Sequence, residues 1–539
     1  MMQSADCPTE TFDLAVIGGG INGCGIARDA AGRGLRVILF EKDDLASGTS
    51  SASTKLIHGG LRYLEHREFR LVREALVERE VLWALAPHII RPMRFVLPHH
   101  PAMRPAWVLR IGLLLYDHLG GRKALPPTRT FSLATDPTGA SLQPRLRTRA
   151  FEYSDCWVDD ARLVVLNARD AGNRGAVIRT RCLVERADRL ADRWIIAATD
   201  RRTGNSDRIE ARALINAAGP WIDRVDQQLR PRTARARVRL VRGTHIVVPR
   251  LFDHDRAYIL QNTDKRIVFA IPYEGRFTLI GTTDCDHTAS LDEVHASPEE
   301  VEYLCRSVSA YFAKPVRPGD VVWSYAGVRS LIEDGSDVAQ AATRDYRLEI
   351  EADGGVPLLS VIGGKITTYR RLAEEALALL DPHVPGLANR NWTRTAPLPG
   401  GDFPMGGVAT LVSSLEHRYP KFDRLYLDRL ARAYGTRAEH ILGEAQEPGD
   451  LGEDFGAGLR EAEVLYLVRE EWAESAADIV WRRSKLGLGM TFRQINLLDD
   501  WLARNRSQAY ACRTPALTST PALARARASA GGGDRSVAK

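Results

Sequence analysis

A group of glycines near the N-terminus has the spacing of a nucleotide-binding turn. Gly18, Gly20 and Gly23 follow a short apolar run, residues 14–17, and precede an apolar segment, residues 21–33. The short run favours a buried strand, and the segment after the glycines favours a helix. Glycines at these positions allow a tight turn, a close approach of a pyrophosphate to the main chain, and close packing of the helix on the strand. The N-terminus of that helix would then face the phosphates.

An acidic residue follows a second predicted strand at the distance that such a turn requires. The strand, residues 36–40, ends on Glu41, which lies 23 residues after Gly18, where a carboxylate can accept hydrogen bonds from a ribose diol. Residues 47–55 are rich in Ser, Thr and Gly, and offer donors where a flavin dinucleotide would bend toward its ring. A solvated polar loop is the alternative interpretation of this composition. These residues predict a bound dinucleotide but leave its identity open.

Two later segments repeat the arrangement of a strand followed by small residues. Residues 213–217 form an apolar run that leads into Ala218, Gly219, Pro220 and Trp221. Residues 358–362 form another, which leads into Gly363 and Gly364 and then a predicted helix, residues 370–380. Both place a glycine turn at the carboxyl end of a strand, where open α/β sheets bind ligands.

The length and composition indicate a multidomain globular enzyme. A chain of 539 residues suggests about three domains. The seven cysteines are scattered, odd in number and never spaced as C-x-x-C, so we expect a reducing, cytoplasm-facing compartment, no disulfide framework and no metal site. Residues 1–11 lack the features of a signal peptide, and no run approaches about 18 apolar residues, so we expect no membrane span.

Most of the net charge of +6 lies in the C-terminal tail. Residues 506–539 carry six basic side chains against a single acidic residue, Asp534. Because residues 1–505 are nearly neutral, we expect no nucleic-acid binding. The Ala, Arg, Ser, Pro and Gly composition of the tail cannot build a core, which predicts disorder.

Between these features the chain alternates helical and strand patterns. Residues 68–85 predict an amphipathic helix. Residues 105–119 are the most apolar helix candidate and are flanked by basic residues; a buried helix is the default interpretation, and an interfacial helix lying on a membrane is the alternative. Residues 236–350 predict an inserted, mainly antiparallel sheet, and residues 405–505 a charged helical region after a Pro/Gly linker.

Taken together, the motifs resemble those of the FAD-dependent, quinone-linked (aerobic) sn-glycerol-3-phosphate dehydrogenases, in the wider family of D-amino-acid-oxidase-like flavoproteins. The resemblance covers residues 12–505 and rests on GGGINGCG (18–25), SSASTKLIHGGLRYLEH (50–66), FEYSDCWVDDARL (151–163), NAAGPW (216–221), GTHIVVP (243–249), GTTD (281–284), GVRSL (327–331), GGKITTYR (363–370) and the Trp481-Arg482-Arg483 segment. There are two departures: Ser330 stands where the family usually has Pro, and the basic tail is not a family feature.

The resemblance implies an α/β fold with a discontinuous, Rossmann-like FAD-binding domain, an inserted, mainly antiparallel substrate domain and a C-terminal α-helical domain. The expected bounds are 12–95, 150–235 and 355–385 for FAD binding, 96–149 and 236–354 for the substrate or cap domain, and 395–505 for the helical domain. The residues expected to bind FAD are Gly18, Gly20, Asn22, Gly23, Glu41, Ser50, Ser51, Ser53, Lys55, His58, Gly60, Cys182, Ala217, Gly219, Trp221, Gly364, Lys365 and Thr367.

The resemblance also implies oxidation of glycerol 3-phosphate at C2 to dihydroxyacetone phosphate. A dianionic phosphate needs several cations, preferably arginines, and the positions that match the family are Arg62, Arg329 and Arg344, with Tyr63 as a neutral donor. His245 is the leading candidate for the base that accepts the C2 hydroxyl proton, although a structural histidine is the alternative. Lys365, at a helix N-terminus, would stabilise negative charge on the reduced flavin or bind substrate.

The expected electron acceptor is a membrane quinone, ubiquinone or menaquinone. A glycerol-3-phosphate oxidase that uses oxygen and releases hydrogen peroxide is the alternative, because the sequence does not expose access to the flavin. A quinone acceptor implies monotopic attachment to the cytoplasmic face of the inner membrane, with a cytoplasmic protein as the alternative. Residues 105–119 and the C-terminal helices are both candidates for the docking element. Family habit implies a homodimer.

Overall fold

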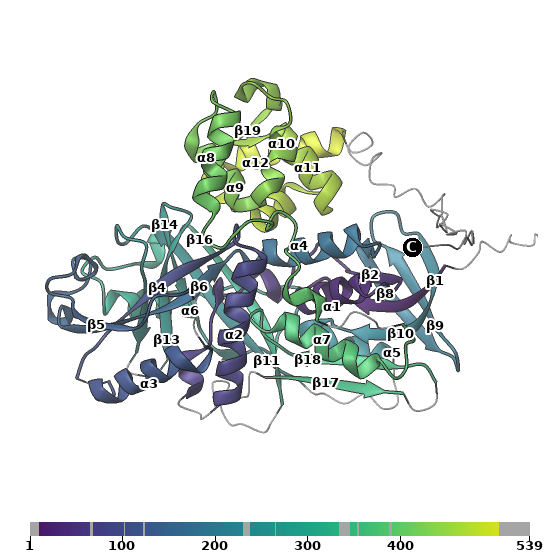
Figure 1. The fold of residues 1–539 in the computed structure, drawn as a ribbon, viewed down its shortest axis with the longest axis horizontal. Helices are drawn as coiled ribbons and strands as arrows, with labels where there is room; N and C mark the ends of the chain where they lie inside the picture. The colour runs from purple at the N-terminus through teal and green to yellow at the C-terminus, as the bar shows by residue number, and fades with distance from the viewer. Residues whose placement is uncertain are drawn as a thin grey trace, which may run out of the picture.

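A computed structural model describes residues 10–64, 68–101, 103–121, 124–229, 238–262, 264, 266–333, 345–352, 355–386 and 391–505. Figure 1 shows three parts: a sheet with helices at the right, a second large sheet at the left, and a helical C-terminal part above both. The predicted disordered tail, residues 506–539, and Arg344 lie outside the described residues, as does the side chain of Arg62.

The first sheet has eight strands, and its centre is parallel. Its main path runs β17-β18-β10-β1-β2-β7, with β8 and β9 added antiparallel along β10. Ile17 lies opposite Asn216 and Phe40, so the carboxyl ends of β1, β10 and β2 meet at one edge. The strands are β1 (Thr11–Ile17), β2 (Val37–Phe40), β7 (Val177–Arg179), β8 (Cys182–Arg189), β9 (Trp194–Asp200), β10 (Ser206–Asn216), β17 (Tyr346–Glu351) and β18 (Leu358–Gly363).

The apolar run of β1 is buried on both faces. Leu14 and Val16 pack in the core that also contains the helices, whereas Ala15 and Ile17 face the core formed with β8 and β9. This alternation explains why the run is continuously apolar. The helices beside this sheet are α1 (Ile21–Gly32), α4 (Asp160–Asn173), α5 (Ile222–Leu229) and α7 (Tyr369–Leu380).

The second sheet has ten strands and is antiparallel except where β4 pairs with β12. Its strands are β3 (Leu56–Ile57), β4 (Ile90–Pro98), β5 (Arg129–Ser132), β6 (Arg149–Val158), β11 (Val238–Pro249), β12 (Ala257–Gln261), β13 (Ile267–Tyr273), β14 (Phe277–Gly281), β15 (Cys285–Asp286) and β16 (Trp323–Ile332). Helix α6 (Pro298–Ser309) packs on one face; α2 (Phe69–Leu85) and α3 (Ala106–Leu119) pack on the other.

The two sheets divide the chain differently from the predicted domain bounds. The FAD-binding bounds include β3, most of β6 and the first six residues of β4, all of which lie in the second sheet. The substrate-domain bounds include β17, which pairs with β18 in the first sheet. Periodicity shows that a segment is a strand but carries no information about its partner, so the expected bounds do not follow the sheet pairing.

Helix α3 is not a buried helix, and the default expectation for this segment is wrong. Its buried residues are Leu113, Tyr116 and Asp117. Trp107 is 67% exposed and Leu114 57%, and Ile111 and Leu115 are also exposed. An apolar composition indicates that a helix avoids water, but it does not show which part of the protein, if any, covers the helix. No helix among the described residues is long and apolar enough to cross a bilayer.

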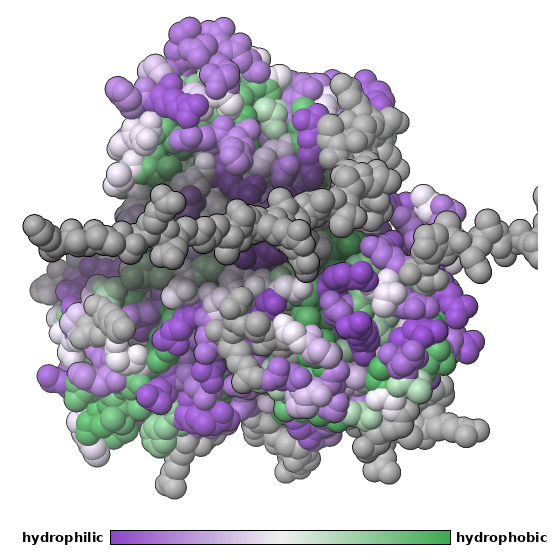
Figure 2. All heavy atoms as spheres, turned by 45° about the vertical axis from the view of Figure 1, so that its right-hand side comes forward, coloured by the Kyte–Doolittle hydropathy of each residue, from purple (hydrophilic) through white to green (hydrophobic). Residues whose placement is uncertain are grey.

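The C-terminal part forms its own core, to which Leu427 and Leu467 belong. In Figure 2 it stands above the rest of the molecule as a lobe whose visible face is mostly hydrophilic. A buried ion pair between Arg162 of α4 and Glu471 joins it to the body. Its elements are α8 (Val408–Arg418), α9 (Arg424–Tyr434), α10 (Ala438–Leu442), the hairpin β19 (Asp454–Gly456) and β20 (Leu459–Arg460), α11 (Glu461–Glu471), a π-helical segment (Asp478–Arg483) and α12 (Phe492–Arg504).

Candidate active site

A cavity of about 1050 Å³ lies at the carboxyl edge of the first sheet. Its walls come from the turns after β1, β10 and β18, and the second sheet closes it through β11 and β16. The cavity is at the upper end of the range of ligand pockets, which suits an extended ligand such as a dinucleotide. Three segments far apart in the sequence therefore meet in one site, as the glycine turns predict.

Gly18 shows why this turn requires glycine. Its φ is +116°, and a Cβ there would lie 2.5 Å from the carbonyl oxygen of Ala217. The turn and the end of β10 thus approach more closely than any side chain permits. Gly23 allows the helix to pack closely on the turn, since a Cβ at this position would lie 1.9 Å from the Gly18 carbonyl oxygen. Gly23 does not line the cavity.

The polar groups beside the turn fit a dinucleotide. Glu41 accepts hydrogen bonds from the backbone N–H groups of Gly19 at 2.7 Å and Asp43 at 2.8 Å. Burial raises the pKa of Glu41 to about 7, although these two N–H groups act in the opposite direction. The buried Oδ1 of Asn22 has no hydrogen-bond partner among the described residues, while its Nδ2 donates to the Gly363 carbonyl at 3.2 Å. The Asn22 acceptor and the N-terminus of α1 supply groups that a bound dinucleotide can satisfy.

A buried ion pair that does not line the cavity holds the Ser/Thr-rich loop after Glu41 in place. Lys55 is 0% exposed, and its Nζ lies 2.7 Å from Asp160 Oδ2 and 2.6 Å from the Ser51 carbonyl. Burial lowers the pKa of Lys55, against the attraction of Asp160. Ser53 also donates to Asp160, at 2.7 Å. Neither Lys55 nor Ser51 lines the cavity, so the structure places these two predicted cofactor residues in support of the loop.

His245 of β11 lines the cavity and is 1% exposed. Its Nε2 lies 2.9 Å from Thr54 Oγ1, and its Nδ1 has no hydrogen-bond partner in the part of the chain that the structure describes. Burial holds the pKa of His245 well below its ordinary value, helped by the charges of Lys55 and Arg329. The imidazole is therefore neutral near pH 7 and able to accept a proton.

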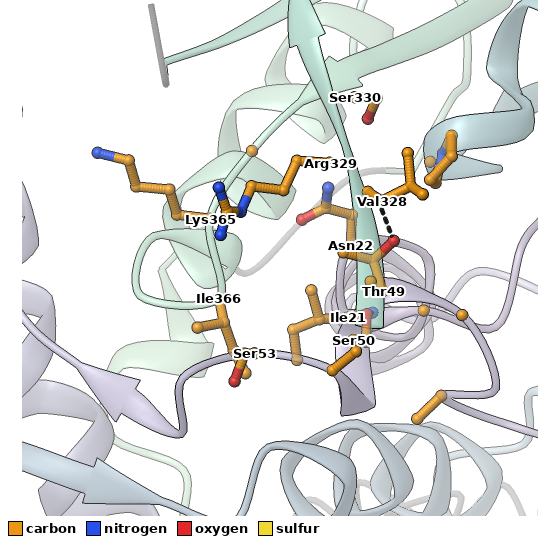
Figure 3. A pocket seen from close by; sticks show the side chains of 18 of the residues that line it. Ile21, Asn22, Thr49, Ser50, Ser53, Val328, Arg329, Ser330, Lys365 and Ile366 are labelled. Atoms are coloured by element: carbon orange, nitrogen blue, oxygen red, sulfur yellow. Dashed lines mark hydrogen bonds between the residues drawn. The ribbon is translucent and has the colours of Figure 1, made fainter. Parts of the chain in front are cut away.

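Two cations line the cavity near this histidine. The guanidinium of Arg329 pairs with Asp284 and lies 3.3 Å from Thr282 Oγ1. The Nζ of Lys365 lies 3.8 Å from the centre of the Tyr63 ring. Figure 3 shows the Arg329 side chain extending from β16 toward the side of the cavity where Lys365 lies. Both cations line the cavity and can contact an anionic substrate, although Asp284 offsets part of the Arg329 charge.

Most of the predicted site residues share this cavity. Those that line it are Gly18, Gly20, Asn22, Glu41, Ser50, Ser53, His58, Gly60, Tyr63, Cys182, Ala217, Gly219, Trp221, His245, Arg329, Gly364, Lys365 and Thr367. The prediction missed Thr54, which contacts His245, and Asp284, which pairs with Arg329. Both lie within motifs that were noted, but only their contacts across the fold give them a role.

Comparisons with known proteins agree with this arrangement. A family model described as FAD dependent oxidoreductase matches residues 13–370, and a model of the C-terminal domain of alpha-glycerophosphate oxidase matches residues 391–502. A glycerol-3-phosphate dehydrogenase of Pseudomonas aeruginosa is 53% identical over 92% of this chain and 95% of its own length. A D-erythritol 1-phosphate dehydrogenase of Brucella abortus is 50% identical over 91% of this chain and 98% of its own length.

Another relative and a solved structure extend this similarity. The aerobic glycerol-3-phosphate dehydrogenase of Escherichia coli is 49% identical over 93% of this chain and 99% of its own length. The structure of the Bacillus halodurans glycerol-3-phosphate dehydrogenase with FAD is 26% identical, covers 95% of this chain and 97% of its own, and has a TM-score of 0.71. The chain therefore belongs to the FAD-dependent oxidoreductases, in the group that contains the glycerol-3-phosphate dehydrogenases, and FAD is its cofactor.

Proposed function

We propose that the protein oxidises sn-glycerol 3-phosphate at C2 to dihydroxyacetone phosphate. The observation that carries the proposal is the meeting of a dinucleotide cradle, two cations and a neutral buried histidine in one cavity. The two glycerol-3-phosphate dehydrogenases at 53% and 49% identity, aligned over nearly their whole length, support the same substrate.

The two cations bind the phosphate in this proposal. A phosphate dianion needs charged donors, and Arg329 offers a planar fork while Lys365 offers a point charge. Tyr63, whose ring lies under the Lys365 ammonium, adds a neutral donor. Arg62 and Arg344 stay proposed substrate residues on the family resemblance.

His245 accepts the proton of the C2 hydroxyl. The lowered pKa keeps the imidazole neutral, and Thr54 fixes one nitrogen so that the other is available. FAD, when bound, supplies the hydride acceptor for the hydrogen on C2. Gly18, Gly20 and Ser50, which lie at the N-terminus of α1, would hold its phosphates, and Glu41 its ribose. Gly364 and Thr367 would hold the ring end, and Asn22 offers an acceptor to a donor group of the cofactor.

The proposed electron acceptor is a membrane quinone, reached by monotopic attachment to the cytoplasmic face of the inner membrane. Helix α3 is the element best suited to the attachment, because Trp107, Ile111 and Leu114 are exposed and Arg104 and Arg110 flank them. Apolar side chains between basic residues suit an anionic lipid surface. We also propose a homodimer, on family habit.

A second substrate is favoured by a specific observation. The D-erythritol 1-phosphate dehydrogenase relative, at 50% identity, lies between the two glycerol-3-phosphate dehydrogenases at 53% and 49%. Both substrates named by these relatives are phosphates of short polyols, so the same two cations serve either one. The difference lies in the length of the carbon chain that the cavity must accept.

Anaerobic mixing tests these assignments. The FAD-loaded protein is mixed with glycerol 3-phosphate or D-erythritol 1-phosphate while flavin absorbance is recorded, and a water-soluble quinone or oxygen is then added. We expect rapid bleaching by glycerol 3-phosphate, slower bleaching by the longer substrate, and reoxidation by the quinone. Faster bleaching by D-erythritol 1-phosphate would make it the preferred substrate in place of glycerol 3-phosphate. Stoichiometric release of hydrogen peroxide on addition of oxygen would identify the protein as an oxidase. No bleaching by either substrate would remove the proposal.

A further inference from the structure

A stack of four rings joins the C-terminal lobe to the proposed catalytic base. The ring of Trp481 lies 4.7 Å from that of Trp323, centre to centre, at an interplanar angle of 18°. Trp323 lies 5.0 Å from Tyr325 with the two rings tilted at 44°, and Tyr325 lies 4.9 Å from His245 at 13°. Each distance is in the range in which aromatic rings attract one another beyond the burial of their surface.

The register of two strands builds the inner part of the stack. Tyr325 of β16 lies directly opposite His245 of β11, and Trp323 lies opposite Val247. Because side chains alternate along a strand, Trp323 and Tyr325 share one face with His245. Cross-strand pairs of this kind stabilise a sheet and fix the positions of their side chains.

Tyr325 is held from both sides. Its hydroxyl donates to the Ser53 carbonyl at 2.9 Å, and the Lys55 ammonium lies 4.7 Å from the centre of its ring. Both contacts come from the loop that lines the cavity. The ring on which His245 rests is therefore fixed relative to the loop that carries Thr54.

The outer end of the stack is fixed by the C-terminal lobe. Lys485 Nζ lies 2.5 Å from the Trp481 carbonyl, and the next residue, Arg482, donates to Asp44 at 2.6 Å. A Cβ at Gly487 would lie 2.7 Å from the Trp481 ring, so this ring fills its space closely. The backbone that carries Trp481 is therefore anchored, and its ring packs against Gly487 and Trp323.

We propose that Trp481 is a positioning residue for the oxidation, acting on His245 through Trp323 and Tyr325. One hydrogen-bond contact, to Thr54, holds the His245 ring among the described residues, and Gly281 packs against its edge. Stacking on Tyr325 adds a contact to the face of the ring, and Trp481 supports the stack from the far end. This inference rests on the proposed function, since it assigns a role in the step that His245 performs.

The test compares Trp481→Ala with Trp481→Phe in the FAD-loaded, full-length protein. The limiting rate of flavin bleaching by glycerol 3-phosphate and the half-saturating substrate concentration are measured for each. Since small misplacements of a catalytic group are costly, we expect Trp481→Ala to lower the limiting rate about tenfold. The half-saturating concentration should change less than about twofold, because the phosphate contacts are untouched. Trp481→Phe, which keeps a ring in the stack, should retain most of the rate.

A matched control is Trp472→Ala. Trp472 is also in the C-terminal lobe and contacts the body, 3.5 Å from the position of a Cβ at Gly172, but it is outside the stack. The variant Trp472→Ala should leave the limiting rate of flavin bleaching unchanged. A rate loss of the same size in this variant, or no loss in Trp481→Ala, would overturn the inference.

Two further variants keep the inference falsifiable. Should Trp481→Ala fail to fold, Trp323→Leu interrupts the stack at its second ring and should lower the limiting rate alike; an unchanged rate overturns the inference. The variant His245→Asn distinguishes a failure of this inference from a failure of the proposed function. If His245→Asn bleaches at the normal rate, His245 is not the base and the proposed mechanism fails; if it slows while both tryptophan variants do not, only the role of the stack is wrong.

Discussion

The carboxylate of Asp44 accepts two hydrogen bonds from the guanidinium of Arg483, at 2.6 and 2.8 Å, across 439 residues of chain. Both side chains are buried, and Arg482 adds a third hydrogen bond to the same carboxylate. Asp44 lies three residues after Glu41, in the loop that surrounds the cavity. The C-terminal lobe therefore stabilises the loop that holds the cofactor.

Asp44→Asn should destabilise the protein by about 3–5 kcal/mol, because it removes the carboxylate that pairs with the fully buried guanidinium of Arg483, whereas Arg482 keeps its pair with Asp478. Urea unfolding measures the change. Asp454→Asn is the control, since Asp454 pairs with Arg460 but its side chain is 47% exposed, and exposed pairs contribute about 0–1 kcal/mol. Equal losses in the two variants would contradict the structural importance of the Asp44 contact.

Gly18→Ala should weaken FAD binding at least tenfold, because the added methyl group meets the Ala217 carbonyl at 2.5 Å and separates two walls of the site. Flavin fluorescence titration of the apoprotein measures the affinity. Gly34→Ala separates crowding from backbone strain: Gly34 has a φ of +93°, but nothing lies within 4 Å of the added Cβ. We expect it to cost about 1–2 kcal/mol of stability and to leave the affinity unchanged.

Arg329→Ala should raise the KM for glycerol 3-phosphate by about 10- to 100-fold, the loss expected when a charged hydrogen bond worth about 1.5–3 kcal/mol is removed. Arg329→Lys should restore little of it, because an ammonium group cannot reproduce the planar fork. Steady-state kinetics with measured FAD content provide the test. Arg239→Ala, on the same sheet but outside the cavity, should leave the KM unchanged; an unchanged KM in Arg329→Ala would exclude the arginine from substrate binding.

His88 predicts a pH dependence of stability. It is 4% exposed, and burial lowers its pKa to about 3, with a smaller contribution from the charge of Arg162. Because the folded pKa lies below the unfolded value of about 6.5, the stability that neutral His88 contributes is present above pH 6.5 and is lost as the pH falls toward 3. The slope is up to about 1.4 kcal/mol per pH unit. His88→Phe should remove this share of the slope in urea unfolding at pH 5.5 and 7.5, and parallel curves for the two proteins would contradict it.

Leu114→Gln should weaken binding to vesicles that contain phosphatidylglycerol by about tenfold, since burying a leucine in an apolar layer is worth about 1.5–3 kcal/mol. Cosedimentation measures the bound fraction. Leu190→Gln changes a leucine that is 41% exposed on another part of the molecule and should leave binding unchanged. If both variants bind as well as the unmodified protein, α3 is not the docking element.

The sequence predicts three central strands of the first sheet, β1, β2 and β10, and the glycine turn, because these depend on local patterns. Strand β1, the glycine turn and α1 are contiguous, so periodicity and spacing specify them. The pairing of β4 and β6 with the second sheet depends on contacts between distant segments. The same limit applies to Lys55, whose direction follows from Asp160, 105 residues later, and to Thr54, 191 residues before His245. Composition likewise could not show that α3 is exposed.

The three-part cavity has a consequence for biosynthesis. Asn22 contacts the Gly363 carbonyl across 341 residues, and the loop after Glu41 is anchored by Arg483. At a synthesis rate of roughly 5–20 residues per second, the glycine turn emerges on the order of tens of seconds before its last wall. During that interval the FAD site is incomplete, so we expect flavin to bind only after almost the whole chain has been made. The lobe, which is made last, anchors a loop of the site that is made first.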